Sequence, residues 1–477
     1  MPTPPWCNEL VNARETPTGI TNQRLLLMAI AAGTTLAPLN STMIAVVLPD
    51  IQQSFDTSVT ATTWLVTIYL ITMAVGQPIG GRLGDQFGRR PVYLIGLAWF
   101  IAASVGCAVA PSLGWLIAFR VQQAMAGTLI FPTGAALVRE AIPTERRGLA
   151  FGMIGLSASV AAASGPPIGG VLSHAFGWAS IFWVNLPLVA LVGVLAWRSL
   201  PARSGPAPAR TRLDFAGIGL MTVALGAIML TPTLLNLDRP ALAAGAVLAG
   251  VVAGWSFLRH EQRVVAPIVD LTLFRRRHFA AACASIMLGN ILMYTTLLAI
   301  PLYLEHARGE SVSRTGLMLG AMSVLAALAT PLGGRWADRL GRWQPAVAGA
   351  LIACAGTFLI GLALGAGGTA FLVFALTVLG LGLGISGAPV QAASVESVPA
   401  GQSGSASGIY STSRYVGSVI GTSALALLFA SEPDPGDTAR FVALFMALGV
   451  IAIAGIAANS RIADRTPSTS PAATAHS

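Results

Sequence analysis

The chain has 477 residues, of which 54% are hydrophobic and only 10% are charged, and its mean hydropathy is +0.72. A soluble domain of ordinary composition is far less apolar, so the sequence indicates a membrane protein. All 28 basic residues are arginine, and the formal net charge of +9 reflects membrane topology rather than nucleic-acid binding.

A membrane-spanning helix needs about 20 predominantly apolar residues. Reading the chain for such runs predicts fourteen spans, at 25–48, 61–80, 92–111, 113–137, 149–172, 178–199, 214–234, 240–258, 279–303, 314–332, 345–365, 369–391, 404–430 and 440–460. The first run is about twice as long as the core of a signal peptide, which predicts an uncleaved span.

The positions of the arginines support this count. Short cytoplasmic loops collect basic residues, whereas exported loops do not. If the tails 1–24 and 461–477 are both cytoplasmic, nearly all arginines outside the spans fall on the cytoplasmic side. Two arginines, Arg120 and Arg414, fall inside spans. An even number of spans with both ends inside therefore fits the sequence.

Two pairs of segments indicate an internal duplication. The segment GGRLGDQFGRR at 80–90 resembles GGRWADRLGRW at 333–343, 253 residues later, and PTERRGLAFG from Pro143 matches PAGQSGSASG from Pro399. The halves are displaced by eight spans although a six-helix repeat needs only six. We therefore expect an all-α membrane protein built as follows: a six-helix bundle at 25–200, two inserted helices with their linkers at 201–278, and a six-helix bundle at 279–460.

The repeated segment predicts a cluster of charges and helix caps on the cytoplasmic face. Its glycines permit a sharp turn and close approach of helices, and its charges can cap helix ends. A single copy could equally be a solvated basic loop, but two copies at the repeat offset argue against that reading. The residues of this cluster are Gly81, Gly84, Asp85, Gly88, Arg89, Arg90, Asp338 and Arg342.

The fourth and fifth spans carry two further motifs. FRVQQAMAG places Arg120 inside a span, followed by Gln122 and Gln123, and a charge at that depth marks a functional site unless it snorkels to the interface. ASGPPIGGVL supplies Gly165, Pro166, Gly169 and Gly170, which permit a bend or close helix packing. The register of the second repeat pair places Gly165 opposite Gly421.

These motifs resemble those of the major facilitator superfamily. WLVTIYL (64–70), GWASIFWVNLP (177–187) and GIYSTSRYVGSVIG (408–421) look like signatures of its fourteen-span drug:proton antiporter family, and the resemblance covers nearly the whole chain except the tails. It implies two bundles that rock about a central cavity. The cluster formed by the 80–90 and 333–343 segments would then be a gate that holds the halves together on the cytoplasmic side, Arg120 would take part in proton coupling, and the fifth-span motif would mark an antiporter.

The substrate cavity is expected near the midplane. Its candidate lining residues are the polar or aromatic ones within apolar spans, although for each of them a helix–helix hydrogen bond or an interface position is an equal alternative. These residues are Trp64, Tyr69, Gln77, Gln123, Asn290, Tyr294 and Gln391.

The first span departs from the family pattern. The family usually has Leu-Asp-x-Thr, with the Asp as a candidate proton site, whereas this chain has Asn40 in the sequence LNST. Asn40 lies about 12 Å from the outer end of its span and Arg120 about 10 Å from the outer end of its own, so the two can pair. An amide does not titrate and does not neutralise the guanidinium.

No acid lies in the middle of a predicted span, which leaves three explanations for coupling. Glu305 with His306 at the end of the ninth span could take over protonation, or remain an ordinary exposed pair. Alternatively, Arg120, with Asn40, Gln123 and Arg414, could act on a substrate that itself carries the proton. The third explanation is a weakly coupled facilitator. Neutral or acidic substrates are favoured over lipophilic cations.

The sequence therefore predicts a secondary active exporter of hydrophobic or amphipathic compounds, in exchange for protons, in a bacterial cytoplasmic membrane. An importer of the same fold is the main alternative, and a non-transporting sensor is a weaker one. No constellation of catalytic or metal-ligating groups and no phosphate-binding loop is present, so an enzyme, a cofactor and ATP-driven transport are not expected. We expect a monomer in the bilayer that binds no nucleic acid.

Overall fold

The computed structural model describes residues 23–57, 59–200, 214–236, 239–264, 267–310, 312–430 and 438–462. Nearly all of both predicted tails and the linker 201–212 lie outside these ranges. Within them the regular elements are helices, joined in places by the short 3₁₀ turns η1 (Thr144–Arg146), η2 (Leu271–Arg275) and η3 (Ala400–Gln402). The α-helices are α2 (Gln23–Ser54), α3 (Val59–Phe87), α4 (Arg89–Ala108), α5 (Leu113–Ala141), α6 (Arg147–Phe176), α7 (Ser180–Trp183), α8 (Asn185–Ser199), α9 (Phe215–Asn236), α10 (Pro240–Glu261), α11 (Arg277–Arg308), α12 (Val312–Leu340), α13 (Trp343–Ala366), α14 (Thr369–Glu396), α15 (Ser403–Ala430) and α16 (Thr438–Asn459).

A helix, or the short pair α7 and α8, lies over each predicted apolar run. Among the described residues, eleven helices are long and apolar enough to cross a membrane, or twelve if the bent helix α6 counts as one span. The described part of α9 is a shorter apolar helix. The expected all-helical membrane fold is therefore confirmed, while the number of fourteen spans is not.

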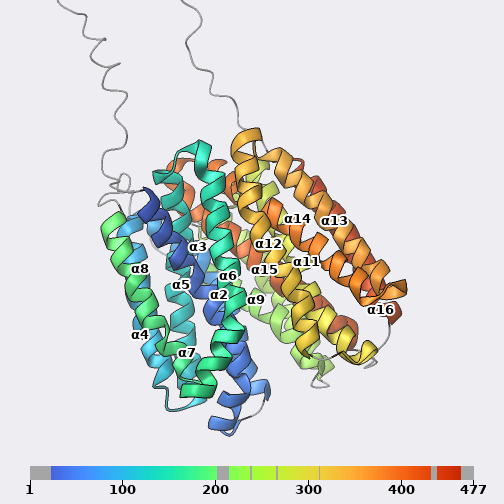
Figure 1. The fold of residues 1–477 in the computed structure, drawn as a ribbon. Helices are drawn as coiled ribbons and strands as arrows, with labels where there is room; N and C mark the ends of the chain where they lie inside the picture. The colour runs from blue at the N-terminus through green and yellow to red at the C-terminus, as the bar shows by residue number, and fades with distance from the viewer. Residues whose placement is uncertain are drawn as a thin grey trace, which may run out of the picture.

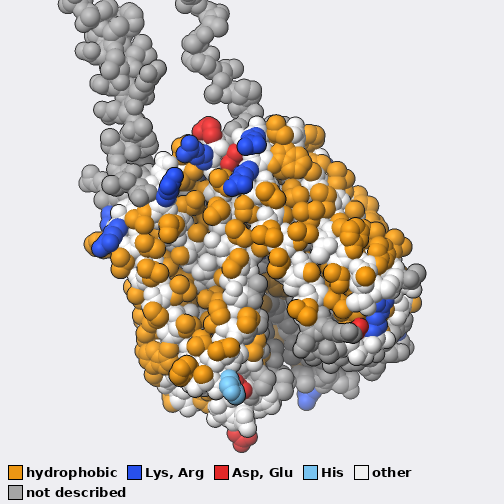
Figure 2. Space-filling model, in the orientation of Figure 1, with side chains coloured by type: hydrophobic (Ala, Val, Ile, Leu, Met, Phe, Trp, Pro, Cys, Tyr) orange, Lys and Arg blue, Asp and Glu red, His pale blue; other side chains and the backbone are white. Residues whose placement is uncertain are grey.

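The sides of the molecule are apolar, as a bilayer requires. Large hydrophobic side chains stay exposed on many helices, for example Val171 at 70%, Trp255 at 56% and Leu317 at 76%. Figure 2 shows this apolar surface, with arginines and acids gathered at its upper end. Asp85 and Asp338 lie near the C-terminal ends of α3 and α12, and we call the end of the molecule that holds them the charged end. Lipid tails are the solvent that such a surface fits.

The helices pack as two groups with a pair between them. Helices α2 to α8 form one group and α11 to α16 the other, as the left and right sides of Figure 1 show. The groups meet where α3 packs on α15 and α6 packs on α12. The inserted helices α9 and α10 pack on each other, and α9 also contacts α3 and α15. The division into two six-helix bundles with an inserted pair stays a prediction.

The repeated glycine-rich segments are mostly helical. We read 80–90 and 333–343 as loops, but α3 continues to Phe87 and α12 to Leu340, so the turns themselves are only Gly88 and the residues around Gly341. Both glycines have a positive φ, 94° and 96°. Because L side chains avoid this region, these two positions favour glycine.

Other glycines in these segments bring the two groups into backbone contact. A Cβ on Gly81 would lie 2.0 Å from the carbonyl oxygen of Gly404, and one on Gly334 would lie 2.2 Å from that of Gly148. Backbone atoms cannot move aside as a flexible side chain can. The absence of a side chain therefore sets how closely α3 approaches α15 and α12 approaches α6.

Gly81→Ala and Gly334→Ala should each lower the melting temperature of the purified protein, because the added methyl group overpacks a backbone contact at a cost of about 1–3 kcal/mol. Gly219→Ala on α9 is the control, since nothing lies within 4 Å of its Cβ position. That variant should melt at or slightly above the wild-type temperature, because alanine favours a helix by about 0.5–1 kcal/mol. Equal melting of Gly81→Ala and wild type would refute the close contact.

Candidate functional site

A polar cluster around Arg120 lies within the α2–α8 group. Arg120 is 0% exposed, and its Nη1 donates to Asn40 Oδ1 at 2.7 Å and to Gln123 Oε1 at 2.6 Å. Gln123 in turn donates from Nε2 to Ser104 Oγ at 2.8 Å. The pairing of Arg120 with Asn40 that helix depth predicts is confirmed. Four helices, α2 to α5, contribute to this cluster through Asn40, Tyr69, Ser104 and Arg120.

The charge of Arg120 has aromatic and amide partners but no acid. Its guanidinium carbon lies 4.3 Å from the centroid of the Tyr69 ring, within range of a cation–π interaction. No ion pair links Arg120 to an acid among the described residues. Its Nε and Nη2, and the Nδ2 of Asn40, have no hydrogen-bond partner there. The cluster therefore holds a net positive charge and unused donors, which suit an acceptor atom of a ligand.

Arg414 brings a second positive charge to the seam between the groups. It lies on α15, and its guanidinium carbon stands 4.6 Å from the ring centroid of Phe131 on α5. The neighbouring Tyr415 packs against the buried cluster that contains Tyr69. Arg414 has one weak hydrogen bond, from Nη2 to Ser411 Oγ at 3.4 Å. Arg120 from the α2–α8 group and Arg414 from the α11–α16 group thus both lie near the buried cluster that contains Tyr69.

Two other candidate lining residues differ in their surroundings. Gln77 on α3 is 0% exposed, and neither of its amide atoms has a partner among the described residues. Asn290 on α11 instead donates from Nδ2 at 2.9 Å to the carbonyl oxygen four residues earlier in its own helix. Gln77 therefore keeps its hydrogen-bonding capacity for a ligand, whereas Asn290 uses one donor within its helix.

The remaining candidates are not brought into the cluster by any contact of the described side chains. Trp64, Tyr294 and Gln391 are half-buried on α3, α11 and α14. Glu305 and His306 lie in α11, but their side chains fall outside the described residues.

At the charged end, Asp85 joins the two groups. Its carboxylate accepts hydrogen bonds from the backbone N–H groups of Gly404 at 3.1 Å and Ser405 at 2.9 Å, at the first turn of α15. Arg89 lies 3.4 Å from Asp85 and 2.8 Å from Glu140. An acid at a helix N-terminus satisfies free N–H groups and interacts favourably with the helix dipole.

The second copy repeats this arrangement with the groups exchanged. Asp338 on α12 accepts hydrogen bonds from the N–H groups of Gly148 at 2.8 Å and Leu149 at 2.7 Å, at the first turn of α6. Arg342 lies 2.9 Å from Asp338 and 3.0 Å from Glu396. Burial alone would lower the pKa of Arg342, but the hydrogen bonds and charges of Glu396 and Asp338 outweigh it and raise that pKa. We call the two copies together the latch.

Three residues of the latch region were not predicted as gate residues from the sequence. Glu140 and Glu396 are the acids that hold Arg89 and Arg342, and Arg139 donates to Ser403 Oγ at 2.7 Å across the seam. The spacing that aligns Pro143 with Pro399 also aligns Glu140 with Glu396, so extending the second repeat by three residues would have found the pair. Arg139 has no equivalent signal.

One predicted gate residue points elsewhere. Arg90 donates from Nη2 at 3.0 Å to the carbonyl oxygen of Trp197 on α8, and its guanidinium carbon lies 5.2 Å from that indole ring. Gly84 does belong to a helix contact, since its Cβ would lie 2.4 Å from the Thr133 side chain on α5. Arg90 therefore holds α4 to α8 and is not part of the latch.

The fifth-span motif bends α6 and packs it on α2. The segments Thr144–Ala162 and Pro167–Phe176 meet at an angle of 42°. A Cβ on Gly165 would lie 1.8 Å from Thr42 Oγ1 of α2, and one on Gly169 would lie 3.1 Å from Met43. The side chain of Pro166 lies outside the described residues, and Gly170 has looser surroundings. The expected bend and close packing are present.

The other half repeats this glycine contact. Gly421 on α15 faces α11, where Thr295 Oγ1 donates to the Gly421 carbonyl oxygen at 3.1 Å. Thr295 and Thr42 are separated by the same 253 residues as the two gate segments. The register that places Gly165 opposite Gly421 is therefore reflected in equivalent contacts.

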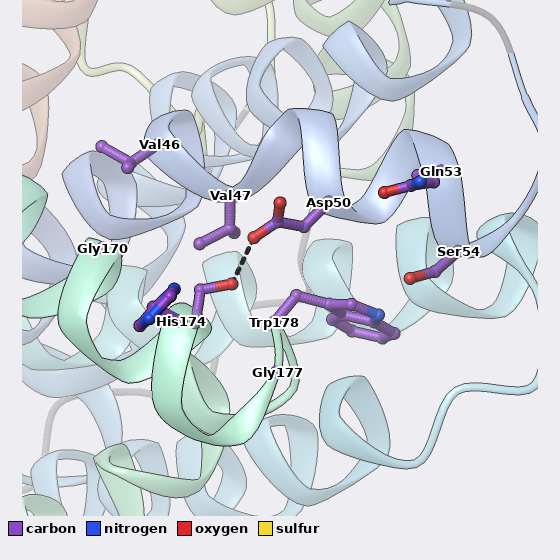
Figure 3. Close-up of a pocket in the computed structure, with 10 residues that line it drawn as sticks. Val46, Val47, Asp50, Gln53, Ser54, Gly170, His174, Gly177 and Trp178 are labelled. Carbon is purple, nitrogen blue, oxygen red and sulfur yellow. Dashed lines mark hydrogen bonds between the residues drawn. The ribbon is translucent and has the colours of Figure 1, made fainter.

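A pocket lies at the end opposite the latch. It has a volume of about 420 Å³ and is lined by residues of α2, the outer part of α6 and the turn that follows, including Asp50, His174 and Trp178. Figure 3 shows Asp50 accepting a hydrogen bond from Ser173 across the two helices. This contact ties the outer segment of α6 to α2.

Asn40→Leu should lower the free energy of unfolding by about 1.5–3 kcal/mol, because a buried guanidinium loses an acceptor. Asn185→Leu is the matched control, since Asn185 is also 0% exposed but has no hydrogen-bond partner among the described residues. Its replacement should be neutral or stabilising. Denaturant titration in detergent measures both, and in a double-mutant cycle Arg120→Leu should abolish the cost of Asn40→Leu. Additive losses would show that the pair is not coupled.

Comparisons with known proteins show which family the chain belongs to. A sequence profile of the Major Facilitator Superfamily matches residues 30–422. The multidrug resistance protein Stp of Mycobacterium tuberculosis (strain CDC 1551 / Oshkosh) is 33% identical over 427 residues, which cover 86% of this chain and 76% of that protein. The methylenomycin A resistance protein of Streptomyces coelicolor is 31% identical over 445 residues, which cover 91% of each chain.

The fold is also found among solved structures. That of the proton:xylose symporter XylE superposes with a TM-score of 0.64 at 14% identity and covers 92% of this chain and 96% of that one. The protein is thus a multi-pass membrane protein, and its bacterial relatives indicate the cytoplasmic membrane. It belongs to the Major Facilitator Superfamily, whose members carry small molecules across membranes and are not enzymes.

Proposed function

We propose that the protein exports hydrophobic or amphipathic compounds, neutral or anionic rather than cationic, by alternating access in exchange for protons. The observation that carries this proposal is the buried Arg120, whose partners are Asn40, Gln123 and Tyr69 and include no carboxylate. The direction of transport follows the related proteins that are named for drug and antibiotic resistance.

The charge of the interior favours this substrate class. Arg120 and Arg414 both lie on spanning helices, and neither forms an ion pair within the described part of the chain. A lipophilic cation would enter a site that already repels it and would find no acid to offset its charge. An anion or a neutral acceptor would instead use the free guanidinium donors of Arg120.

The latch supports the alternating-access part of the proposal. Because Asp85 and Asp338 cap helices of the opposite group, separating the groups at the charged end breaks both sets of hydrogen bonds at once. The rule that cytoplasmic loops are basic makes this the cytoplasmic end, and the start of α2 and the end of α16 lie on the same side. The structure then represents a state closed to the cytoplasm.

The amide at position 40 restricts the routes by which protons can be coupled to transport. Asn40 does not titrate, so a proton can cross on the substrate itself, with Arg120 binding its deprotonated form. The Glu305 and His306 pair offers another route. A weakly coupled facilitator is the second candidate function, and the replacement of the family's first-span acid by Asn40 is the observation that favours it.

A transport screen tests the proposal. Purified protein in liposomes, with an imposed pH gradient, should move neutral or anionic amphipathic compounds and should discriminate against ethidium and quaternary ammonium compounds. Arg120→Ala should reduce transport of the anions at least tenfold, because a buried charge–charge contact exceeds about 1.4 kcal/mol. Efficient export of the cations by the wild type would contradict the assigned substrate class.

Asn40→Asp should add proton-coupled efflux of cations, because it places a titratable carboxylate 2.7 Å from the guanidinium. Asn290→Asp is the control, since Asn290 is a similarly buried amide on a spanning helix of the other group. It should give no gain. Equal gains in both variants would show that any intramembrane acid suffices and that Asn40 does not determine specificity.

A further inference from the structure

A second group of charged side chains lies where the inserted helix pair begins and ends. Asp214 directly precedes α9, and Glu261 is the last residue of α10. Their exposed fractions are only 9% and 3%. Two acids buried side by side are costly when both are ionised, and neither has a place in the site around Arg120.

In each acid, one carboxylate oxygen accepts hydrogen bonds and the other has no hydrogen-bond partner among the described residues. Asp214 Oδ1 accepts hydrogen bonds from the N–H of Gly217 at 3.0 Å and from His260 Nε2 at 2.8 Å. Glu261 Oε2 accepts one from the N–H of Val269 at 3.2 Å. Asp214 Oδ2 and Glu261 Oε1 are buried and have no hydrogen-bond partner among the described residues.

The two free oxygens converge on one place. A Cβ on Gly217 would lie 2.6 Å from Asp214 Oδ2 and 2.7 Å from Glu261 Oε1. Because glycine has no side chain, the space between the carboxylates stays open to both. Two acceptors that face each other in a buried position repel unless a proton lies between them.

The surrounding charges decide which acid takes the proton. Arg82 approaches from α3, His260 from α10 and Asp270 from the segment before α11. Burial raises the pKa of Asp214, but the hydrogen bonds from Gly217 and His260 outweigh it and lower that pKa. Asp214 therefore stays ionised and disfavours a second negative charge on Glu261.

We propose that Asp214 and Glu261 form a proton-binding site where the inserted helices begin and end, and that this site senses the pH at the charged end. A proton from the adjacent solution forms an O–H bond on Glu261 Oε1, and this O–H is directed at Asp214 Oδ2. The site lies beside the latch rather than near Arg120, so it exchanges protons with one side of the membrane only. This pH-sensing role is separate from the proposed exchange of substrate for protons.

The site connects to the latch through Arg82. This residue lies one helical turn before Asp85 on α3, and its Nη1 donates to the carbonyl oxygen of Pro267 in the segment before α11. Its positive charge is attracted to Glu261 and Asp214. Protonation of Glu261 removes part of that attraction, which loosens α3 from the segment that leads into α11.

Infrared difference spectroscopy of the purified full-length protein tests the site without any transport assay. A titration from about pH 5 to pH 9 should show a protonated-carboxyl band that Glu261→Gln lacks. Glu145→Gln, which changes an exposed glutamate at the same end, should keep the band. A band that survives in Glu261→Gln would overturn the proposal.

Asp214→Asn provides a second, independent variant if Glu261→Gln fails to fold. Removal of the neighbouring negative charge should move the midpoint of the band to lower pH by about one unit. An unmoved midpoint would refute the pairing.

In liposomes with a constant pH gradient, a common shift of the pH on both sides should change the transport rate of the wild type and of Glu145→Gln more than that of Glu261→Gln. If Glu261→Gln kept the wild-type pH profile, the link to the latch would be wrong. If no compound is transported while the Glu261 band is present, the proposed export function fails and the proton site stands.

Discussion

The structure depends on the burial of the Arg120 charge. A guanidinium at 0% exposure within a membrane is costly, and here amides and an aromatic ring offset that cost without neutralising the charge. Its contacts fix the relative rotation of α2, α4 and α5 and the position of Tyr69 on α3. The same contacts leave the guanidinium without an acid, so one set of interactions determines both the packing of the first group and the positive charge in its interior.

Much of the helical fold and of the cluster around Arg120 could be predicted from the sequence. The apolar runs locate the helices, although α3 and α12 continue well beyond their predicted ends. Helix rise also places Asn40 level with Arg120, because depth along each helix follows from the sequence alone. The predictions that were wrong concern features that depend on contacts between helices. The 80–90 segment appeared to be a loop because glycines often mark turns, whereas only Gly88 turns and Gly81 serves backbone contact. Similarly, Arg90 could not be separated from Arg89 by spacing alone.

The duplication is preserved at the latch and in the glycine contacts and is lost in the polar cluster around Arg120. The latch acids and the glycine–threonine contacts occur in both halves at the same offsets. By contrast, the position equivalent to Asn40 is Met293, and the position equivalent to Arg414 is Ala158. Closing two similar halves requires matching surfaces, while recognition of one asymmetric compound does not. The polar site therefore had to be located from individual residues rather than from the repeat.

The inserted helices make the two seams unequal. Helix α9 packs on both α3 and α15, whereas among the described residues the inserted helices make no comparable contact with α6 or α12. If the halves separate at the charged end, α9 must lose its contact with one of its two neighbours or move with it. The acids at the foot of the pair lie next to α3, and Arg82 on that helix is attracted to them. A change of their charge would therefore act on the seam between α3 and α15 rather than on the α6–α12 seam.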